Sequence, residues 1–263
     1  MSSKTNVISA LINLYNCKSF KVNDYADVDN KINKKGTAFE NFVKKLFIDT
    51  NDNDFLNNIK DYFSHLGDQN HPPDLILKEG DAFEIKEKKS ASGDIQLNSS
   101  FLRDTLKIDD PKLTDKCRNC EDVAWKEKDI FYVIGHVDTN KNLKSIFFVQ
   151  GICIACPTHY YKDLFNSFKQ HIYKGDFSFS ETKELARLNN IDPLDYTHLR
   201  VRSMFLLRHP TKIFNFFKIN KSSDLNVFCL MTNKKYSSFQ KDLLQILEKK
   251  NDIEIQDKNI TSP

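Results

Sequence analysis

The segment that decides the fold reads Pro73-Asp74-Leu75-Ile76-Leu77-Lys78-Glu79-Gly80-Asp81-Ala82-Phe83-Glu84-Ile85-Lys86. Its apolar and β-branched residues predict two short strands, 74–78 and 82–87. The three residues between them, 79–81, predict a tight hairpin loop in which Gly80 supplies the positive φ. The segment therefore predicts a hairpin of two antiparallel strands.

Alternation along the second strand separates its apolar residues from its charged ones. Phe83 and Ile85 fall on one face, where they can enter a core. Glu84 and Lys86 fall on the other face, which Asp74 can reach from the neighbouring strand. Two carboxylates and one ammonium suit a hard divalent cation, because the carboxylates can bind Mg²⁺ and the lysine can orient or deprotonate a water. This pattern is that of a PD-(D/E)XK nuclease site.

Two other interpretations of the segment stay open. Residues 87–89, Glu-Lys-Lys, fit the same acidic-x-basic pattern, although that register would bury Lys88, whereas Ile85 extends the apolar face of Phe83. The segment also fits a solvated hairpin with a charged outer face. With 36 acidic and 39 basic residues in 263, the triplet arises by chance at ~0.02 per position. The motif therefore needs support from its surroundings.

Blocks on both sides of the motif resemble the NgoPII family of type II restriction endonucleases. They occur in colinear order from roughly Gly36 to Arg202: His71 to Leu77, Gly80 to Lys86, Leu97 to Ser100, Lys112-Leu113-Thr114 with Cys117, Trp125 to Val137, Glu181 to Leu185, Ile191 to Leu194 and Leu199 to Arg202. The resemblance implies an α/β fold with a central mixed β-sheet flanked by helices, a PD-(D/E)XK restriction-endonuclease-like core. It also implies a Mg²⁺-dependent homodimer that cuts double-stranded DNA at a short palindrome, GGCC in the named member.

The expected function is therefore that of a type II restriction endonuclease. Mg²⁺ would be held by Asp74, Glu84 and the backbone carbonyl of Ile85, while Lys86 would position the attacking water and stabilise negative charge on the phosphate. Glu40, on a helix expected at 37–48, is an auxiliary candidate or an ordinary exposed glutamate. A cognate DNA methyltransferase is expected in the same system, without physical contact. The alternatives are another nuclease on the same core (repair or RNA-cleaving) and a non-catalytic, zinc-stabilised DNA-binding protein.

Two segments offer groups that could read a G/C-rich palindrome, since Arg matches guanine O6 and N7, and Asn, Gln and Ser can supply further contacts. The first follows the catalytic strand and contains Gln96, Asn98, Ser99, Ser100 and Arg103. The second contains Arg200 and Arg202, which alternation places on one face of a strand, opposite Val201. The alternative for this arginine pair is a salt bridge with Asp192 or Asp195 that only holds the fold.

The cysteines raise the question of zinc. Cys117 and Cys120 form one C-x₂-C pair, and Cys153 and Cys156 form another, which together could supply four thiolates. However, 32 residues separate the pairs, and the second pair borders apolar residues at the end of a strand, where cysteine behaves as a small hydrophobe. Zinc at these cysteines is possible but not favoured.

Composition predicts a single domain over residues 1–263 in the cytoplasm. The chain has no Gly/Pro/Ser-rich linker and no apolar run long enough to span a membrane, and its net charge is only +3. With 7 glycines it carries neither a P-loop nor a dinucleotide-binding fingerprint. Apolar periodicity predicts helices at 6–15, 37–48, 54–65, 158–173, 181–189 and 237–249, and further strands at 129–137, 144–152 and 199–207.

Overall fold

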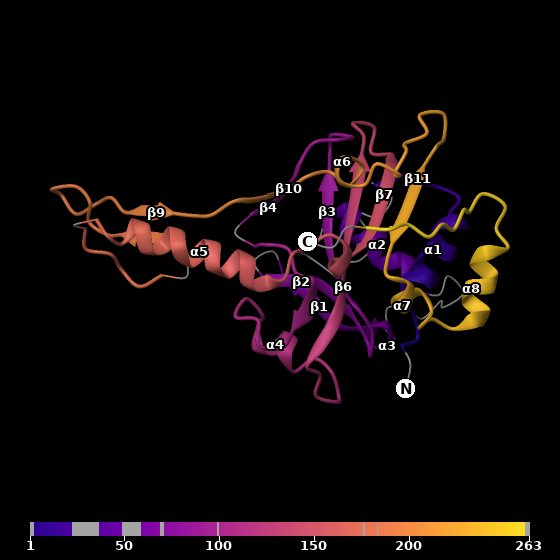
Figure 1. Cartoon of the computed structure of the whole chain (residues 1–263), viewed down its shortest axis with the longest axis horizontal. Coiled ribbons are helices and arrows are strands. Elements are labelled where there is room, and N and C mark those ends of the chain that lie inside the picture. The colour runs from indigo at the N-terminus through magenta and orange to yellow at the C-terminus, as the bar shows by residue number, and fades with distance from the viewer. Residues whose placement is uncertain are drawn as a thin grey trace.

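The computed structural model describes residues 3–22, 37–48, 59–68, 71–98, 100–175, 177–182 and 184–260. Across these ranges the centre of the molecule is a mixed seven-stranded sheet with the order β1-β2-β3-β6-β7-β11, and β5 pairs with β6 (Figure 1). Its strands are β1 (Phe63–Asp68), β2 (His71–Leu77), β3 (Ala82–Lys88), β5 (Thr105–Lys107), β6 (Glu127–Val137), β7 (Leu143–Gln150) and β11 (Asn226–Leu230). The expected α/β fold with a mixed central sheet is confirmed.

The sheet is mixed because hairpins alternate with crossovers. The β2–β3 and β6–β7 pairs are antiparallel, as short connections require, whereas β3 lies parallel to β6 and β11 lies parallel to β7. The parallel register places Glu84 beside Tyr132 and Lys86 beside Ile134. The candidate site therefore lies on a strand inside the sheet, with β2 on one side and β6 on the other.

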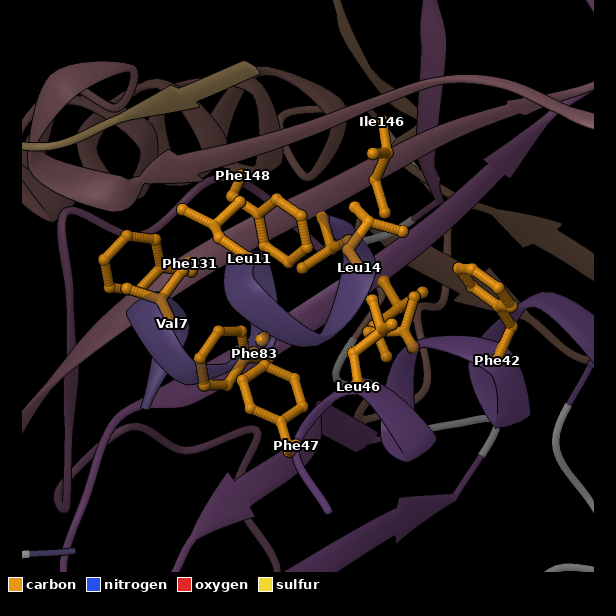
Figure 2. Packing of buried hydrophobic residues seen from close by; sticks show 14 of the residues in the cluster. Val7, Leu11, Leu14, Phe42, Leu46, Phe47, Phe83, Phe131, Ile146 and Phe148 are labelled. Atoms are coloured by element: carbon orange, nitrogen blue, oxygen red, sulfur yellow. The ribbon is translucent and has the colours of Figure 1, made fainter. Parts of the chain in front are cut away.

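Helices α1 (Val7–Tyr15), α2 (Ala38–Leu46) and α8 (Lys241–Glu248) supply the apolar residues that cover one face of the sheet. In α2 the buried side chains recur at three- and four-residue spacing, and Thr37 closes its N-terminus with a capping box. Figure 2 shows α1 and α2 meeting the sheet, where Phe83 and Phe131 lie between them and the strands. Phe83 is fully buried and Ile85 is 4% exposed, which confirms the face predicted for both.

The opposite face carries a second core. Its centre is Ile76 and Ala82 of the hairpin together with Tyr132 and Phe147. It is covered by the small sheet of β4 (Ile95–Asn98) and β10 (Phe205–Leu207) and by the chain around α6 (Pro210–Ile213), where Phe217 packs on Phe147. The remaining short elements are α3 (Ile59–Tyr62), α4 (Asp115–Arg118), the 3₁₀ turn η2 (Gly151–Cys153) and α7 (Asn233–Tyr236).

A long arm projects from this body at the left of Figure 1. It is formed by α5 (Thr158–Ile172) and by a separate two-stranded sheet of β8 (Ala186–Leu188) and β9 (Leu199–Val201). We refer to residues 158–204 as the arm. Within the described residues, no helix is both long and apolar enough to cross a bilayer.

Three secondary-structure predictions were wrong. Of the helix expected at 54–65, residues 54–58 lie outside the described ranges, and the rest is the short α3 followed by β1, because 63–68 pairs with β2 along the sheet edge. The helix expected at 181–189, whose residue 183 is not described, contains β8, which β9 holds as a strand. The single strand expected at 199–207 is β9 and β10, which belong to different sheets. In each case pairing with a distant segment overrides local preference.

The hairpin turn also differs from its prediction. The residue with positive φ is Glu79, at 55°, and no described glycine has a positive φ. The space around Gly80 is tight instead, since a Cβ atom there would lie 3.0 Å from both the Leu77 Cβ and the Ser3 Oγ. The hairpin itself, with Leu75 opposite Phe83, is as predicted.

Candidate active site

The three motif residues lie together on the β2–β3 hairpin. The Lys86 Nζ lies 2.7 Å from the Glu84 Oε1 and 3.9 Å from the Asp74 Oδ2. Asp74 is held in turn by the backbone amide of Ile85, which donates to its Oδ2 at 2.5 Å. These side chains are 13–25% exposed, so the group is largely withdrawn from water but open to an incoming ligand. Strand alternation and antiparallel pairing therefore produce the cluster that the sequence predicted.

The electrostatics of the cluster are those of a site that attracts a cation. Burial, followed by the nearby negative charge of Glu84, raises the pKa of Asp74 to about 7, against the opposing effects of Lys86 and the Ile85 amide. Burial alone would lower the pKa of Lys86, but the carboxylates of Glu84 and Asp74 outweigh it, and the net shift is upward. One ammonium thus only partly offsets two carboxylates that repel each other.

Glu84 provides the test of whether a metal fits. Its Oε1 receives Lys86, but its Oε2 is buried and has no hydrogen-bond partner. A buried carboxylate oxygen without a partner is costly unless a ligand satisfies it. Among the described residues, no three His, Cys, Asp or Glu side chains converge into a metal cluster. Mg²⁺ does not require one, because it retains several waters and is commonly held by one or two carboxylates. Asp74 and Glu84 therefore fit Mg²⁺.

Helix α2 brings two more charges to the site. It lies against the sheet at Gly135, where a Cβ atom would fall 2.1 Å from the Phe39 ring, so only glycine allows this approach. Burial raises the pKa of Glu40, and the charges of Lys86 and Glu84 both act on it. Its carboxylate also accepts the Thr37 amide in the capping box, at 3.3 Å. The structure therefore places Glu40 near the cluster, at the start of the helix.

Lys44 is a neighbour of the site that the sequence analysis missed. It is only 5% exposed, and burial lowers its pKa against the attraction of Glu40 and Asp74. The available signal was the spacing, because residues 40 and 44 are four apart and share one face of a helix. Lys44 therefore adds a second cation on the α2 side of Asp74.

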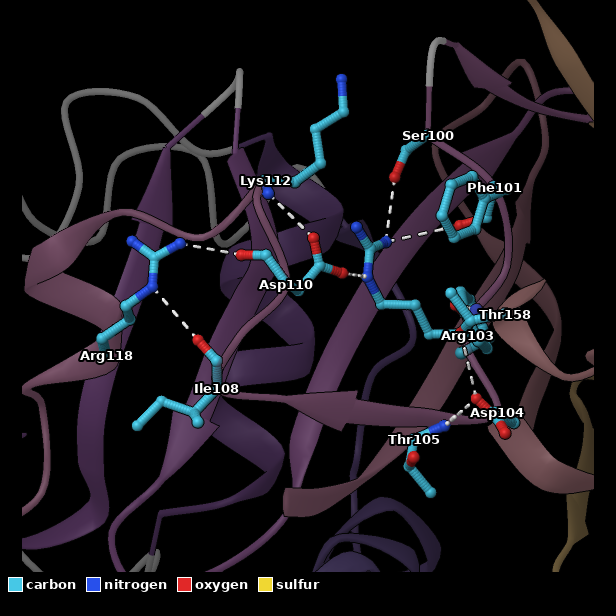
Figure 3. A network of polar contacts seen from close by, with 11 residues as sticks. Ser100, Phe101, Arg103, Asp104, Thr105, Ile108, Asp110, Lys112, Arg118 and Thr158 are labelled. Atoms are coloured by element: carbon cyan, nitrogen blue, oxygen red, sulfur yellow. Dashed lines mark hydrogen bonds and ion pairs between the residues drawn. The ribbon is translucent and has the colours of Figure 1, made fainter. Parts of the chain in front are cut away.

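The first predicted DNA-reading segment divides into exposed and buried parts. Gln96 is exposed on β4, Ser99 lies outside the described residues, and the side chain of Asn98 is not described. Arg103 is 3% exposed, and its Nε donates to the Asp110 Oδ2 at 2.6 Å. Its Nη1 donates to the Ser100 Oγ and to the Phe101 carbonyl (Figure 3). Arg103 therefore organises the loop between β4 and α4 in this structure.

The second segment lies on the arm. Arg200 and Arg202 point the same way, as alternation predicted, and both bond to Glu184. The salt bridge weighed from the sequence therefore exists, but with Glu184 and not with Asp192 or Asp195. Both arginines remain more than half exposed. The partner was not foreseen because Glu184 was assigned to a helix.

The cysteines do not gather into a metal site. All six are free thiols, and all six lie within the described ranges. Burial raises the pKa of Cys153 to about 11, and it also raises the pKa of the fully buried Cys117. Among the described residues, no three His, Cys, Asp or Glu side chains converge, so the two C-x₂-C pairs do not form a four-thiolate cluster in this structure.

Comparison with known proteins gives a consistent result. The NgoPII restriction endonuclease family matches residues 5–261 of this chain. The type II restriction enzyme NgoPII of Neisseria gonorrhoeae is 37% identical over 264 residues, which cover 97% of this chain and 94% of that protein. No solved structure shows a significant match.

Proposed function

Because the chain belongs to the NgoPII restriction endonuclease family, we propose that it cuts double-stranded DNA at a short G/C-rich palindrome resembling GGCC, with Mg²⁺ as cofactor. The family and its relative identify a site-specific DNA endonuclease of a restriction-modification system. The metal, the recognition sequence, the PD-(D/E)XK core and the homodimer are parts of the proposal. So are a single domain over 1–263, action in the cytoplasm and a cognate methyltransferase that makes no contact with the enzyme.

One observation carries the proposed chemistry: the unpartnered Oε2 of Glu84 beside Asp74 and Lys86. Asp74, Glu84 and the Ile85 carbonyl would hold Mg²⁺, which when bound supplies Lewis-acid polarisation of the scissile phosphate and of a water. The Ile85 amide fixes Asp74, so that its carboxylate is oriented before a ligand arrives. This orientation reduces the reorganisation needed when DNA binds.

Lys86 supplies positive charge at the reacting phosphate. Its ammonium is held at 2.7 Å from the Glu84 Oε1 and has two further N–H groups that can donate to a water or to a phosphate oxygen. With its pKa raised it remains protonated, so it orients the water and stabilises developing negative charge. Glu40 and Lys44, on α2, are proposed to balance the charge around Asp74.

The proposed DNA contacts are Gln96, Asn98, Ser99, Ser100, Arg200 and Arg202. Arg202 bonds to Glu184 through its Nε alone, so its two Nη groups could contact a guanine while the ion pair is kept, whereas Arg200 would have to release its Nη2 from Glu184. Arg103 is proposed to contribute indirectly, by fixing the loop that carries Ser100. A repair or RNA-cleaving role on the same site predicts cleavage without a palindromic preference.

Digestion of plasmid DNA with purified protein and Mg²⁺, followed by sequencing of the ends, tests the proposal. We expect discrete fragments whose ends all fall within one palindrome, and no cleavage when the divalent cation is chelated. Random ends, or preference for RNA, would replace the proposal by the alternative nuclease. Absence of any cleavage across Mg²⁺ concentrations, by protein that binds DNA and zinc, would favour the non-catalytic alternative.

A further inference from the structure

We infer that the arm, residues 158–204, is the surface on which two copies of this chain pair, with the exposed stripe of α5 at the centre of the contact. The homodimer is part of the proposed function, and the inference rests on it. What the structure adds is the location of the interface and the residue that lies on its symmetry axis.

The first observation is where exposed apolar residues gather. Of the 19 large apolar side chains that are exposed in the described part of the chain, ten lie in the arm, between Tyr160 and Met204. Among them are Phe177 at 67%, Leu194 at 66% and Tyr196 at 81%. Scattered exposed apolar residues are normal, but their concentration on one projecting segment indicates a surface that another protein covers.

The second observation is the helix itself. Not one of the 15 residues of α5 is buried, although most helical stability in proteins comes from packing an apolar face. Tyr161 packs against Phe101 and Phe205 at the base of the arm. Tyr160, Leu164 and Phe168 form an adjacent stripe, each four residues from the next, and are 52–59% exposed. This stripe has no covering element within the described chain.

The size of the surface fits a dimer. At about 200 Å² per large side chain, the exposed fractions of these ten residues amount to roughly 1,200 Å². A standard interface buries about 800 Å² on each partner, so coverage of most of these residues is sufficient.

The near-neutral charge of the arm favours a protein partner over DNA for its apolar stripe, and leaves only Arg200 and Arg202 as proposed DNA contacts there. Residues 158–204 contain seven Lys or Arg and six Asp or Glu, which is close to balance. Its two neighbouring arginines, Arg200 and Arg202, both bond to Glu184. Surfaces that bind DNA are polar and strongly positive, whereas this surface is apolar and nearly neutral. A second copy fits because the stripe can complement itself.

We place the two-fold axis perpendicular to α5, where the two stripes meet in antiparallel directions. In a symmetric dimer the same patch faces itself, so antiparallel α5 helices bring Tyr160 of one copy to Phe168 of its partner. Leu164, midway between them, then lies on the axis and meets its own counterpart. The three positions are about 6 Å apart along the helix, so the axis is defined to within one turn.

Sedimentation analysis of the full chain tests the inference. We expect wild-type protein at twice 30.6 kDa. The double variant Leu164→Asp/Phe168→Asp should weaken association by roughly 100-fold and sediment as a monomer with an unchanged circular dichroism spectrum. The matched control is Ile246→Asp, on α8 at the other end of the molecule, where a similarly exposed residue (46%) should leave the dimer intact. A monomeric wild type, or a double variant that stays dimeric, overturns the inference.

Cysteine cross-linking gives a second measurement that does not depend on the aspartates being tolerated. Under mild oxidation Leu164→Cys should form a disulfide-linked dimer well above the wild-type background, whereas Ile246→Cys should not. Equal yields of disulfide-linked dimer for the two variants would refute the position of the two-fold axis at Leu164. Altered DNA affinity in the aspartate variant without a change in mass would assign the arm to DNA instead. A wild-type monomer that cuts DNA refutes the homodimer and its interface on the arm but leaves the nuclease activity, whereas a dimer without Mg²⁺-dependent cleavage refutes only the nuclease activity.

Discussion

Replacing Lys86 by alanine should separate cleavage from DNA binding, if the proposed site carries out the reaction. The substitution removes the ammonium that lies 2.7 Å from Glu84 and 3.9 Å from Asp74. It leaves both carboxylates in place, together with the Ile85 amide that bonds to Asp74. One preorganised donor to a developing negative charge contributes about 3–4 kcal/mol to the transition state, or roughly 10²–10³ in rate. We expect a loss of at least this size in cleavage, since Lys86 also orients the water.

DNA binding should change in the opposite direction to cleavage or not at all. With the lysine gone, two carboxylates remain without their cation, so the site should retain or increase its attraction for a divalent metal. Single-turnover cleavage of a cognate duplex with Mg²⁺, and anisotropy of the same duplex with Ca²⁺, report the two properties separately. We expect slow cleavage by Lys86→Ala and a cognate Kd close to that of the wild type.

Lys88→Ala is the matched control, because Lys88 lies two residues further on the same strand and its Nζ donates to the Asp94 carbonyl at 2.6 Å. It should retain cleavage within a few-fold of the wild type. Cleavage by Lys86→Ala within tenfold of the wild type would refute the reasoning. The register at 87–89, and Lys89 in particular, would then become the alternative site.

Four further predictions concern charge, packing and metal. Asp74→Asn or Glu84→Gln should stop cleavage and, without divalent metal, tighten DNA binding by removing repulsion from the phosphate; weaker binding by both variants would contradict this. Arg103→Met should lower the free energy of unfolding by about 3 kcal/mol, because it leaves the Asp110 carboxylate buried without its cation, and adding Asp110→Asn should restore part of the loss in urea titrations. His209 has a pKa of about 4, lowered by burial and then by Lys212, so it contributes stability that is complete above pH 6.5 and is lost as the pH falls toward 4. His209→Asn keeps an acceptor for the Thr211 amide. Between pH 6.5 and 4 its free energy of unfolding should therefore fall by about 3 kcal/mol less than that of the wild type, and an identical dependence of this free energy on pH in the two proteins would disprove this. Metal analysis of protein purified without chelator should find no stoichiometric zinc, and one zinc per chain would instead make Cys117, Cys120, Cys153 and Cys156 a structural site.

The sequence by itself determined the hairpin and the arrangement of its charged side chains. Strand alternation has a period of two, so the identities of residues 83–86 decided which face enters the core and which carries Glu84 and Lys86. The apolar spacing of residues 38–47 likewise determined α2 and the face that it buries. These features depend on neighbouring residues alone, which is why a linear pattern was sufficient.

Only the tertiary structure decided the features that depend on distant partners. Arg103, predicted from the sequence to contact DNA, is buried and bonds to Asp110 and Ser100 in the fold. Glu184 is the partner of Arg200 because β9 makes residues 186–188 a strand. Lys44 joined the site because Gly135 lets α2 approach the sheet. Each of these outcomes is set by contacts between segments far apart in the sequence, and the free energy of those contacts exceeds the local preferences from which a pattern is read.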